Sequence, residues 1–296
     1  MHPFFGALLA GGPVVTDGAW GTELQARGLA SGEIPDAWNL SHPERVTEVA
    51  RAYVAAGSQV ILTNTFGANR VRLGGHALES QVAEINRRGV ALSRKAAEGN
   101  ARVFASLGPT GKLLMTGELT SEEMRAAFAE QTRALAAAQP DALVLETMSD
   151  LAEAKLALAA AKETGLPVVV CLVFDSGRDH DRTMMGATPE QAARELAAAG
   201  ADAIGANCGV GIAAYVPVCR RLRAATDLPI WIKPNAGLPL VVADKLVYQA
   251  TPESFAEQVP ALVTAGANFI GGCCGSNHDF IQAVRRRLSG RPANTH

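Results

Sequence analysis

Three features of the sequence predict an α/β fold built as a single (β/α)8 TIM barrel. β-Branched apolar runs recur at fairly even intervals, and each is followed by an alanine- and leucine-rich stretch with helical spacing. The runs are nearly continuous in apolar residues, which is typical of parallel strands covered on both faces. Eight such units in 296 residues, with no shift in composition that would mark a linker, predict one domain over residues 1–296.

The predicted strands follow one another along the whole chain. They are VVTDGA (14–19), SQVILTNTF (58–66), ARVFASLGP (101–109), ALVLETM (142–148), PVVVCLVF (167–174), ADAIGANC (201–208), PIWIKPNAG (229–237) and NFIGGCCG (268–275). Helix starts between them are indicated by a Ser or Thr followed three residues later by Glu or Gln, as in Ser41 with Glu44, Thr120 with Glu123 and Thr188 with Gln191. An open doubly wound sheet is the alternative, but no glycine-rich dinucleotide fingerprint follows an early strand.

The composition argues against several functional classes. Hydrophobic residues make up 48% of the chain and charged residues 19%, and the formal net charge is -2, so the chain lacks the basic excess of nucleic-acid-binding proteins. The opening MHPFFGALLAGGP is apolar but too short to span a membrane, and it lacks a basic start. We therefore expect a cytoplasmic protein with reduced cysteines and with no nucleic-acid or membrane partner. The sequence does not fix the oligomeric state.

Three of the five cysteines lie at the ends of predicted strands. Cys208 follows ADAIGAN, whereas Cys273 and Cys274 are adjacent within GGCCG. Consecutive side chains of a regular strand point to opposite faces, so this pair must sit where the strand breaks, and the flanking glycines permit the break. Three thiolates with one open position suit a catalytic zinc ion. Buried free cysteines, or a Cys273–Cys274 disulfide with a redox role and no metal, remain alternatives on spacing alone.

Polar residues end several of the predicted strands. They are Asp17 in the first, Asn64 in the second, Glu146 in the fourth, Asn207 and Cys208 in the sixth, Asn235 in the seventh, and Cys273 and Cys274 in the eighth. Active sites of (β/α)8 barrels lie at the C-terminal ends of the strands, so we expect these side chains to gather at one end of the barrel. The sixth and eighth strands are close around the ring, which lets the sulfurs meet.

The segments DGAWGT, TNTFGANR, GPTG, LETM, RTMMG, ANCG, KPNAG and GGCCG, in this order, resemble the homocysteine S-methyltransferase family over about residues 10–290. That family includes betaine–homocysteine methyltransferases, S-methylmethionine-dependent enzymes and the homocysteine-binding module of cobalamin-dependent methionine synthase. The resemblance implies a zinc-containing barrel that methylates the thiol of L-homocysteine to form methionine. It also implies that Cys208, Cys273 and Cys274 ligate the zinc, and that Asp17 and Glu146 lie near the amino group of the substrate.

The predicted substrate-binding residues are Asp17, Glu146, Asn207 and Asn64, and each also has a structural interpretation. Asp17 could form a turn with the glycine that follows it, and Glu146 could form a salt bridge with Lys233. The two asparagines could orient the site or cap the helices that follow them. The residues alone leave these alternatives open.

Betaine or a related onium compound is the favoured methyl donor. A quaternary ammonium suits an aromatic cage, and Trp20, Trp38 and Phe66 are the best-placed aromatic residues in a chain that is 5% aromatic. Gly67 stands where the vertebrate betaine enzymes have tyrosine, which weakens a site of that type. The alternatives are transfer from S-methylmethionine, transfer from a partner methylcorrinoid protein, and a non-catalytic barrel that binds a thiol or zinc without turnover.

Overall fold

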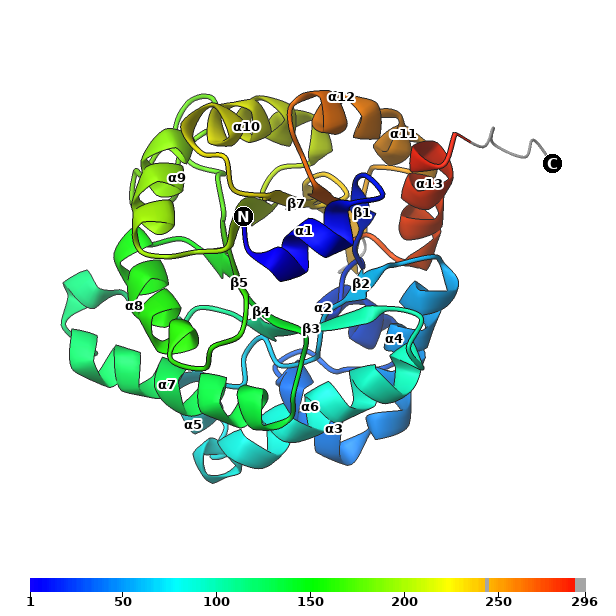
Figure 1. Ribbon diagram of the computed structural model, residues 1–296. Helices are drawn as coiled ribbons and strands as arrows, with labels where there is room; N and C mark the ends of the chain where they lie inside the picture. The colour runs from blue at the N-terminus through cyan, green and yellow to red at the C-terminus, as the bar shows by residue number, and fades with distance from the viewer. Residues whose placement is uncertain (243–244, 291–296) are drawn as a thin grey trace.

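In the computed structural model, which describes residues 1–242 and 245–290, eight parallel strands form a nearly closed ring surrounded by helices (Figure 1). The strand order is β1-β10-β7-β6-β5-β4-β3-β2. The strands are β1 (Val14–Val15), β2 (Val60–Ile61), β3 (Arg102–Leu107), β4 (Ala142–Met148), β5 (Val168–Leu172), β6 (Ala203–Cys208), β7 (Ile230–Pro234) and β10 (Phe269–Ile270). A hydrogen bond from Gln59 N to Val15 O at 2.8 Å joins β2 to β1. The predicted (β/α)8 barrel is confirmed; residues 243–244 and 291–296 of the predicted domain lie outside the described residues.

Helices cover the outside of the ring (Figure 1). The longer ones are α4 (Pro43–Ala55), α6 (Val82–Ala97), α7 (Ser121–Ala137), α8 (Leu151–Lys162), α9 (Pro189–Ala198), α10 (Ile212–Ala225) and α13 (His278–Leu288). The shorter ones are α2 (Gly21–Ala26), α3 (Trp38–Ser41), α5 (Arg70–Gly74), α11 (Pro252–Glu257) and α12 (Val259–Thr264), with 3₁₀ turns at η1 (Pro35–Ala37), η2 (Glu79–Gln81) and η3 (Leu114–Thr116).

Two of the three predicted helix starts are confirmed. Thr120 forms a full capping box with Glu123, and the Thr188 side chain accepts a hydrogen bond from the backbone N of Gln191. The prediction at Ser41 is wrong. The chain is still helical there, so the Ser41 hydroxyl donates to the carbonyl of Ala37 at 3.3 Å, and α4 begins at Pro43 without a side-chain cap.

Helix α1 (Pro3–Leu9) closes the end of the barrel at which the strands begin and crosses the centre of the ring in Figure 1. Phe5 is fully buried, and its ring centroid lies 5.7 Å from that of Phe269 and 6.1 Å from that of Phe104. Trp231 stacks on Phe104 with centroids 5.9 Å apart. The rings of Phe104, Trp231 and Phe269 come from the first halves of their strands, and with Phe5 of α1 they fill the barrel interior at this end. The opposite end, where the strands finish, is the one available for a site.

Seven of the eight predicted strands are longer than the observed ones, and the excess is greatest for the second and eighth. Strands β1, β2 and β10 have two residues each, because the chain leaves the sheet where polar residues and glycines follow. At Gly271, a Cβ would lie 2.0 Å from Thr16 Oγ1, so only glycine permits this close approach of β10 to β1. An antiparallel hairpin of β8 (Pro239–Val242) and β9 (Lys245–Tyr248) follows β7, and the sequence analysis did not predict it.

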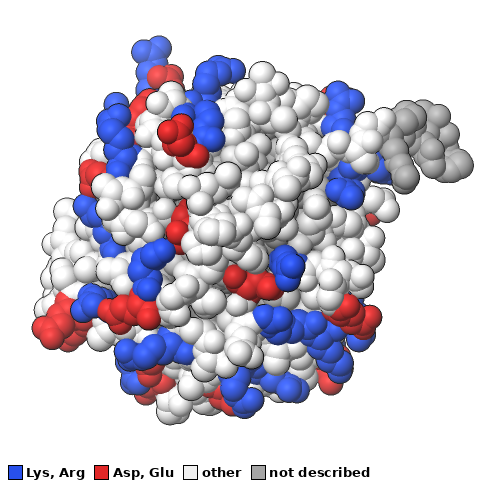
Figure 2. Space-filling model, viewed as in Figure 1, with Lys and Arg blue, Asp and Glu red and all other residues white. Residues whose placement is uncertain are grey.

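The described surface carries charges of both signs. Lys and Arg side chains are mixed with Asp and Glu around the rim of the face in Figure 2, and few charges lie near its centre. Within the described part of the chain, no helix combines the length and the apolarity that a membrane crossing needs.

Candidate functional site

Three cysteine sulfurs lie together where β6 and β10 end. Cys208 is the last residue of β6, and Cys273 and Cys274 follow the end of β10. All three sulfurs lie within 4.8 Å of one another, and those of Cys208 and Cys273 are 3.1 Å apart. All three cysteines are free and partly buried. The structure therefore brings together the side chains that the sequence analysis predicted as a zinc site.

Unusual backbone at both strand ends directs the sulfurs to one point. Cys208 has a φ of +62°, a left-handed conformation that non-glycine residues seldom adopt. Gly209 continues this turn, and a Cβ there would lie 2.5 Å from the Tyr215 hydroxyl. On the other segment, Cys273 N donates to Pro234 O at 2.8 Å, which fastens the cysteine pair to the end of β7. The strained backbone at Cys208 thus occurs where the side chain must point toward the other two sulfurs.

Hydrogen bonds among the three thiols set their acidity. Donation from Cys208 and then from Cys273 lowers the pKa of Cys274 to about 3. Hydrogen bonds with Cys273, and to a smaller extent with Cys274, favour the protonated form of Cys208 and raise its pKa far above the ordinary value. One thiolate is therefore stabilised by two neighbouring S–H groups. A dication at this point would replace those protons, and three thiolates with an open fourth position fit zinc.

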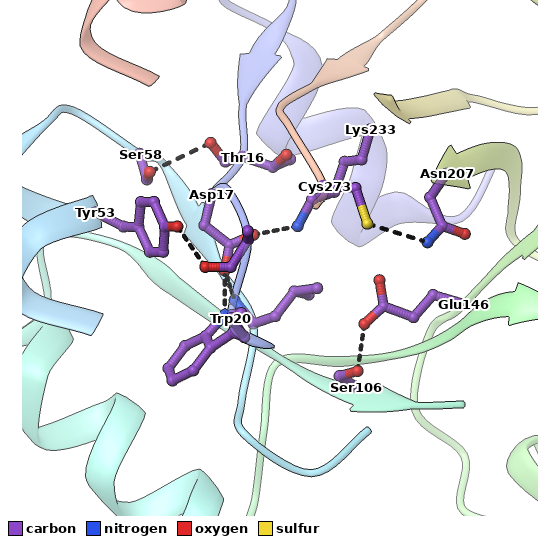
Figure 3. A network of polar contacts seen from close by, with 12 residues as sticks. Thr16, Asp17, Trp20, Tyr53, Ser58, Ser106, Glu146, Asn207, Lys233 and Cys273 are labelled. Atoms are coloured by element: carbon purple, nitrogen blue, oxygen red, sulfur yellow. Dashed lines mark hydrogen bonds and ion pairs between the residues drawn. The ribbon is translucent and has the colours of Figure 1, made fainter. Parts of the chain in front are cut away.

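Asn207 and Thr147 lie beside the sulfurs. Asn207 Nδ2 donates to Thr147 Oγ1 and Thr147 N donates to Asn207 Oδ1, both at 2.7 Å. The same Nδ2 is 3.9 Å from the Cys273 sulfur (Figure 3). It is also 3.8 Å from the Cys208 sulfur. Asn207 thus contacts two of the sulfurs, and the residue that precedes α10 is Gly211, not Asn207. The sequence analysis did not single out Thr147, although it lies in the LETM segment at the end of β4.

Glu146 projects from β4 toward the same region. Its Oε1 accepts a hydrogen bond from the hydroxyl of Ser106, a residue of β3 (Figure 3). The side chain is largely buried, and this burial raises the pKa of Glu146 to about 7, against the opposing effect of the Lys233 charge. A carboxylate held in this way is suited to a cationic ligand group, because a positive charge would favour its ionised form.

Asp17 is fully buried and is bonded to groups of the protein. Lys233 Nζ donates to Oδ1, and Trp20 Nε1 donates to Oδ2 at 2.8 Å (Figure 3). Leu62 N also donates to Oδ2, at 2.7 Å. Lys233 therefore pairs with Asp17, not with Glu146. Both carboxylate oxygens of Asp17 are thereby satisfied, and Lys233 and Trp20 present their own surfaces to the neighbouring cavity.

A cavity of about 370 Å³ extends from the sulfurs, a size suited to small molecules. Two of the predicted aromatic residues, Trp20 and Phe66, line it, and so does Asn64. Asn64 Nδ2 donates to Pro35 O at 2.8 Å, which ties the loop after β2 to another segment of the wall. Trp38 does not reach the cavity. It is 3% exposed, and its ring centroid lies 4.4 Å from that of His42.

Two charged residues of the cavity wall were missed by the sequence analysis. Asp36 lies in η1, is 2% exposed, and accepts a hydrogen bond from Gly67 N at 2.8 Å. Arg72 lies in α5. Neither follows a strand directly, so their places depend on how two long loops fold over the barrel mouth.

The buried Asp36 leads to a testable effect of pH on stability. Burial raises the pKa of Asp36 from 3.8 to about 6, so the folded protein keeps a proton that the unfolded chain has released, and the free energy of unfolding falls as the pH rises through this window. The side chain of Asp36→Asn stays neutral at every pH. We therefore expect the free energy of unfolding of the variant, relative to that of the unmodified protein, to rise by roughly 3 kcal/mol from below the lower of these two pH values to above the higher. Urea unfolding of both proteins at several pH values measures the gain; a difference that is constant with pH would contradict it.

Comparison with known proteins gives a consistent result. The chain matches a family model described as homocysteine S-methyltransferase over residues 14–288. Methionine synthases of Mycobacterium leprae and Mycobacterium tuberculosis are each 28% identical over 290 residues, which is 92% of this chain and 24% of those proteins. The chain thus spans about a quarter of the length of these relatives. The metallated form of the Escherichia coli homocysteine methyltransferase MmuM aligns with a TM-score of 0.81 and 25% identity, covering 96% of this chain and 99% of that one.

Proposed function

The chain belongs to the homocysteine S-methyltransferase family, and from that premise we propose that it methylates L-homocysteine at a zinc ion held by Cys208, Cys273 and Cys274. The methyl donor in this proposal is a small onium compound such as betaine, and the product is methionine. The convergence of three sulfurs beside a cavity of small-molecule size carries the proposal. The likeness to MmuM, which was solved in a metallated form, supports it. We place the protein in the cytoplasm, where thiols stay reduced.

Zinc would supply thiol activation, because a free thiol with a pKa of about 8.5 is mostly protonated at neutral pH and coordination removes its proton. The side chains of the protein position the sulfurs and bind the substrate. Asn207 holds the Cys208 and Cys273 sulfurs in place, and Glu146 receives the ammonium group of homocysteine. Asp17 acts on the substrate through Lys233 and Trp20, to which it is bonded. Asn64 fixes the loop that borders the cavity.

The bonds and charges of the methyl-transfer step balance without an added proton. A bond forms between the homocysteine sulfur and the methyl carbon, and the bond from that carbon to the onium nitrogen or sulfur breaks, with its electron pair leaving on the donor atom. The thiolate becomes a neutral thioether, and the onium cation becomes a neutral amine or thioether. The three atoms must be in line at near-attack distance, which binding both substrates in one cavity would achieve.

A donor screen on zinc-loaded protein tests the proposal. With homocysteine as acceptor, we expect methionine from betaine, S-methylmethionine or a dimethylsulfonio compound, and none from free methylcobalamin. Protein treated with a chelator serves as the control and should regain activity when zinc is restored. Homocysteine binding without methionine from any donor would instead indicate a non-catalytic thiol-binding barrel.

A methylcorrinoid protein as methyl donor is the second candidate. It is favoured by the match of this chain, at 28% identity, to a stretch that makes up 24% of two methionine synthases. Methionine formed from methylcobalamin alone would support this candidate and would exclude the onium donors.

A further inference from the structure

The cavity wall on the side away from the sulfurs holds a guanidinium, that of Arg72. Strands β6 and β2 are four steps apart in either direction around the ring of eight, so Cys208 at the end of β6 lies opposite the segment that follows β2. Arg72 belongs to helix α5 in that segment, and both Arg72 and Cys208 line the cavity. The cavity therefore spans the barrel mouth, with sulfur at one side and a guanidinium at the other.

Neighbouring groups fix the position of Arg72. The side chain of Asn69 caps α5 and accepts a hydrogen bond from Arg72 N at 3.0 Å. The guanidinium carbon lies 5.5 Å from the centroid of the Phe66 ring, a cation–π contact. Phe66 in turn packs on Gly108, where a Cβ would lie 2.4 Å from the ring. The guanidinium is thus oriented before any ligand binds, which reduces the entropy cost of binding.

The charge of Arg72 has no ion-pair partner within 4.0 Å among the residues that the structure describes. Arg70, on the same helix, is paired with Glu130 at 2.5 Å. The other charged residue of this wall, Asp36, accepts its hydrogen bond from Gly67 N instead. A guanidinium beside a largely apolar cavity is suited to a carboxylate, which it can bind through two parallel hydrogen bonds.

Gly67 lets both charged side chains pack closely against the loop after β2. A Cβ at Gly67 would lie 2.8 Å from Asp36 Oδ2 and 3.4 Å from Arg72 Nε, so a side chain there would displace them. Arg72 itself lines the cavity, so a ligand in the cavity can meet its guanidinium. We propose that Arg72 binds the carboxylate of the methyl donor, so that the cavity selects donors in which an onium group and a carboxylate belong to one small molecule. This inference rests on the methyl-transfer function proposed above.

Two sulfonium ions that differ in a carboxylate test the inference. Dimethylsulfoniopropionate carries one and trimethylsulfonium does not. In zinc-loaded unmodified protein, we expect kcat/KM to be roughly 10- to 100-fold higher for dimethylsulfoniopropionate, the range given by a charge-assisted hydrogen bond. Arg72→Gln should remove most of this preference through a higher KM for dimethylsulfoniopropionate, and should leave the KM for homocysteine and the kinetics with trimethylsulfonium within about twofold. Arg70→Gln is the matched control on the same helix and should change none of these values.

Specific results would overturn the inference. One is an unchanged KM for dimethylsulfoniopropionate in Arg72→Gln, and another is an equal loss with both sulfonium ions. A raised KM for homocysteine would assign Arg72 to the acceptor instead. Thermal unfolding and zinc content report whether Arg72→Gln is intact; if it is not, Arg72→Lys keeps the charge but loses the planar fork, and an unchanged donor KM there overturns the inference equally. No methionine from any donor in unmodified protein would defeat the proposed function itself.

Discussion

Cys208→Ala is expected to abolish methyl transfer and to lower bound zinc far below one ion per chain. The three sulfurs lie within 4.8 Å of one another, so each one is a large part of the donor set. Losing only a hydrogen-bond partner of a metal ligand costs up to about 100-fold in affinity or activity, and losing the ligand itself should cost more. Methionine formation and zinc content by mass spectrometry measure the two effects.

Cys219→Ala is the matched control. Cys219 is fully buried in α10 and is not a member of the three-sulfur cluster, and its sulfur lies 3.9 Å from the carbonyl of Leu262. This variant should keep both zinc and activity, although it loses some packing. Zinc-edge X-ray absorption should count three sulfur neighbours in the unmodified protein and four with homocysteine bound. Full activity in Cys208→Ala, or reduced protein without zinc but with a redox-active Cys273–Cys274 pair, would refute the three-sulfur site.

The barrel could be predicted because its signal is local. A strand buried on both faces must be apolar along its length, and the predicted bounds of β4, 142–148, match the observed Ala142–Met148. Helix α1 was missed because its stability depends on contacts with distant parts of the chain. A short apolar segment does not show in its own sequence that Phe5 packs against Phe104 and Phe269. The hairpin of β8 and β9 was missed for a related reason, since its apolar residues were not separated from the end of the seventh strand.

The site shows the same division between local and tertiary signals. The three cysteines could be predicted because glycines beside adjacent cysteines mark a strand that breaks at a functional point. The partner of Asp17 could not, because Lys233 reaches it from a strand more than two hundred residues later in the chain. Arg72 gave no signal for a similar reason. Its place at the cavity depends on a loop that folds over the barrel mouth.

Asp17→Asn is expected to destabilise the protein by about 3–5 kcal/mol, the usual cost of removing one partner of a buried ion pair. Lys233 is 2% exposed and Asp17 is 0% exposed, so the substitution leaves a cation in the interior without its counter-charge. Asparagine also offers one acceptor oxygen, whereas Asp17 accepts hydrogen bonds on both oxygens from Lys233, Trp20 and Leu62. Guanidinium unfolding of zinc-loaded protein measures the loss.

The double variant Asp17→Asn with Lys233→Met separates the structural role of Asp17 from a direct role in binding. Removing both charges eliminates the unpaired cation, so most of the lost stability should return. If Asp17 acts on the substrate only through its partners, homocysteine affinity measured by calorimetry should be no lower in this variant than in Lys233→Met alone. A loss of affinity well beyond that of Lys233→Met, with stability restored, would mean that Asp17 itself meets the substrate ammonium. A single variant as stable as the unmodified protein would contradict the ion-pair argument, because a buried lysine without a partner must either lose its proton or destabilise the fold.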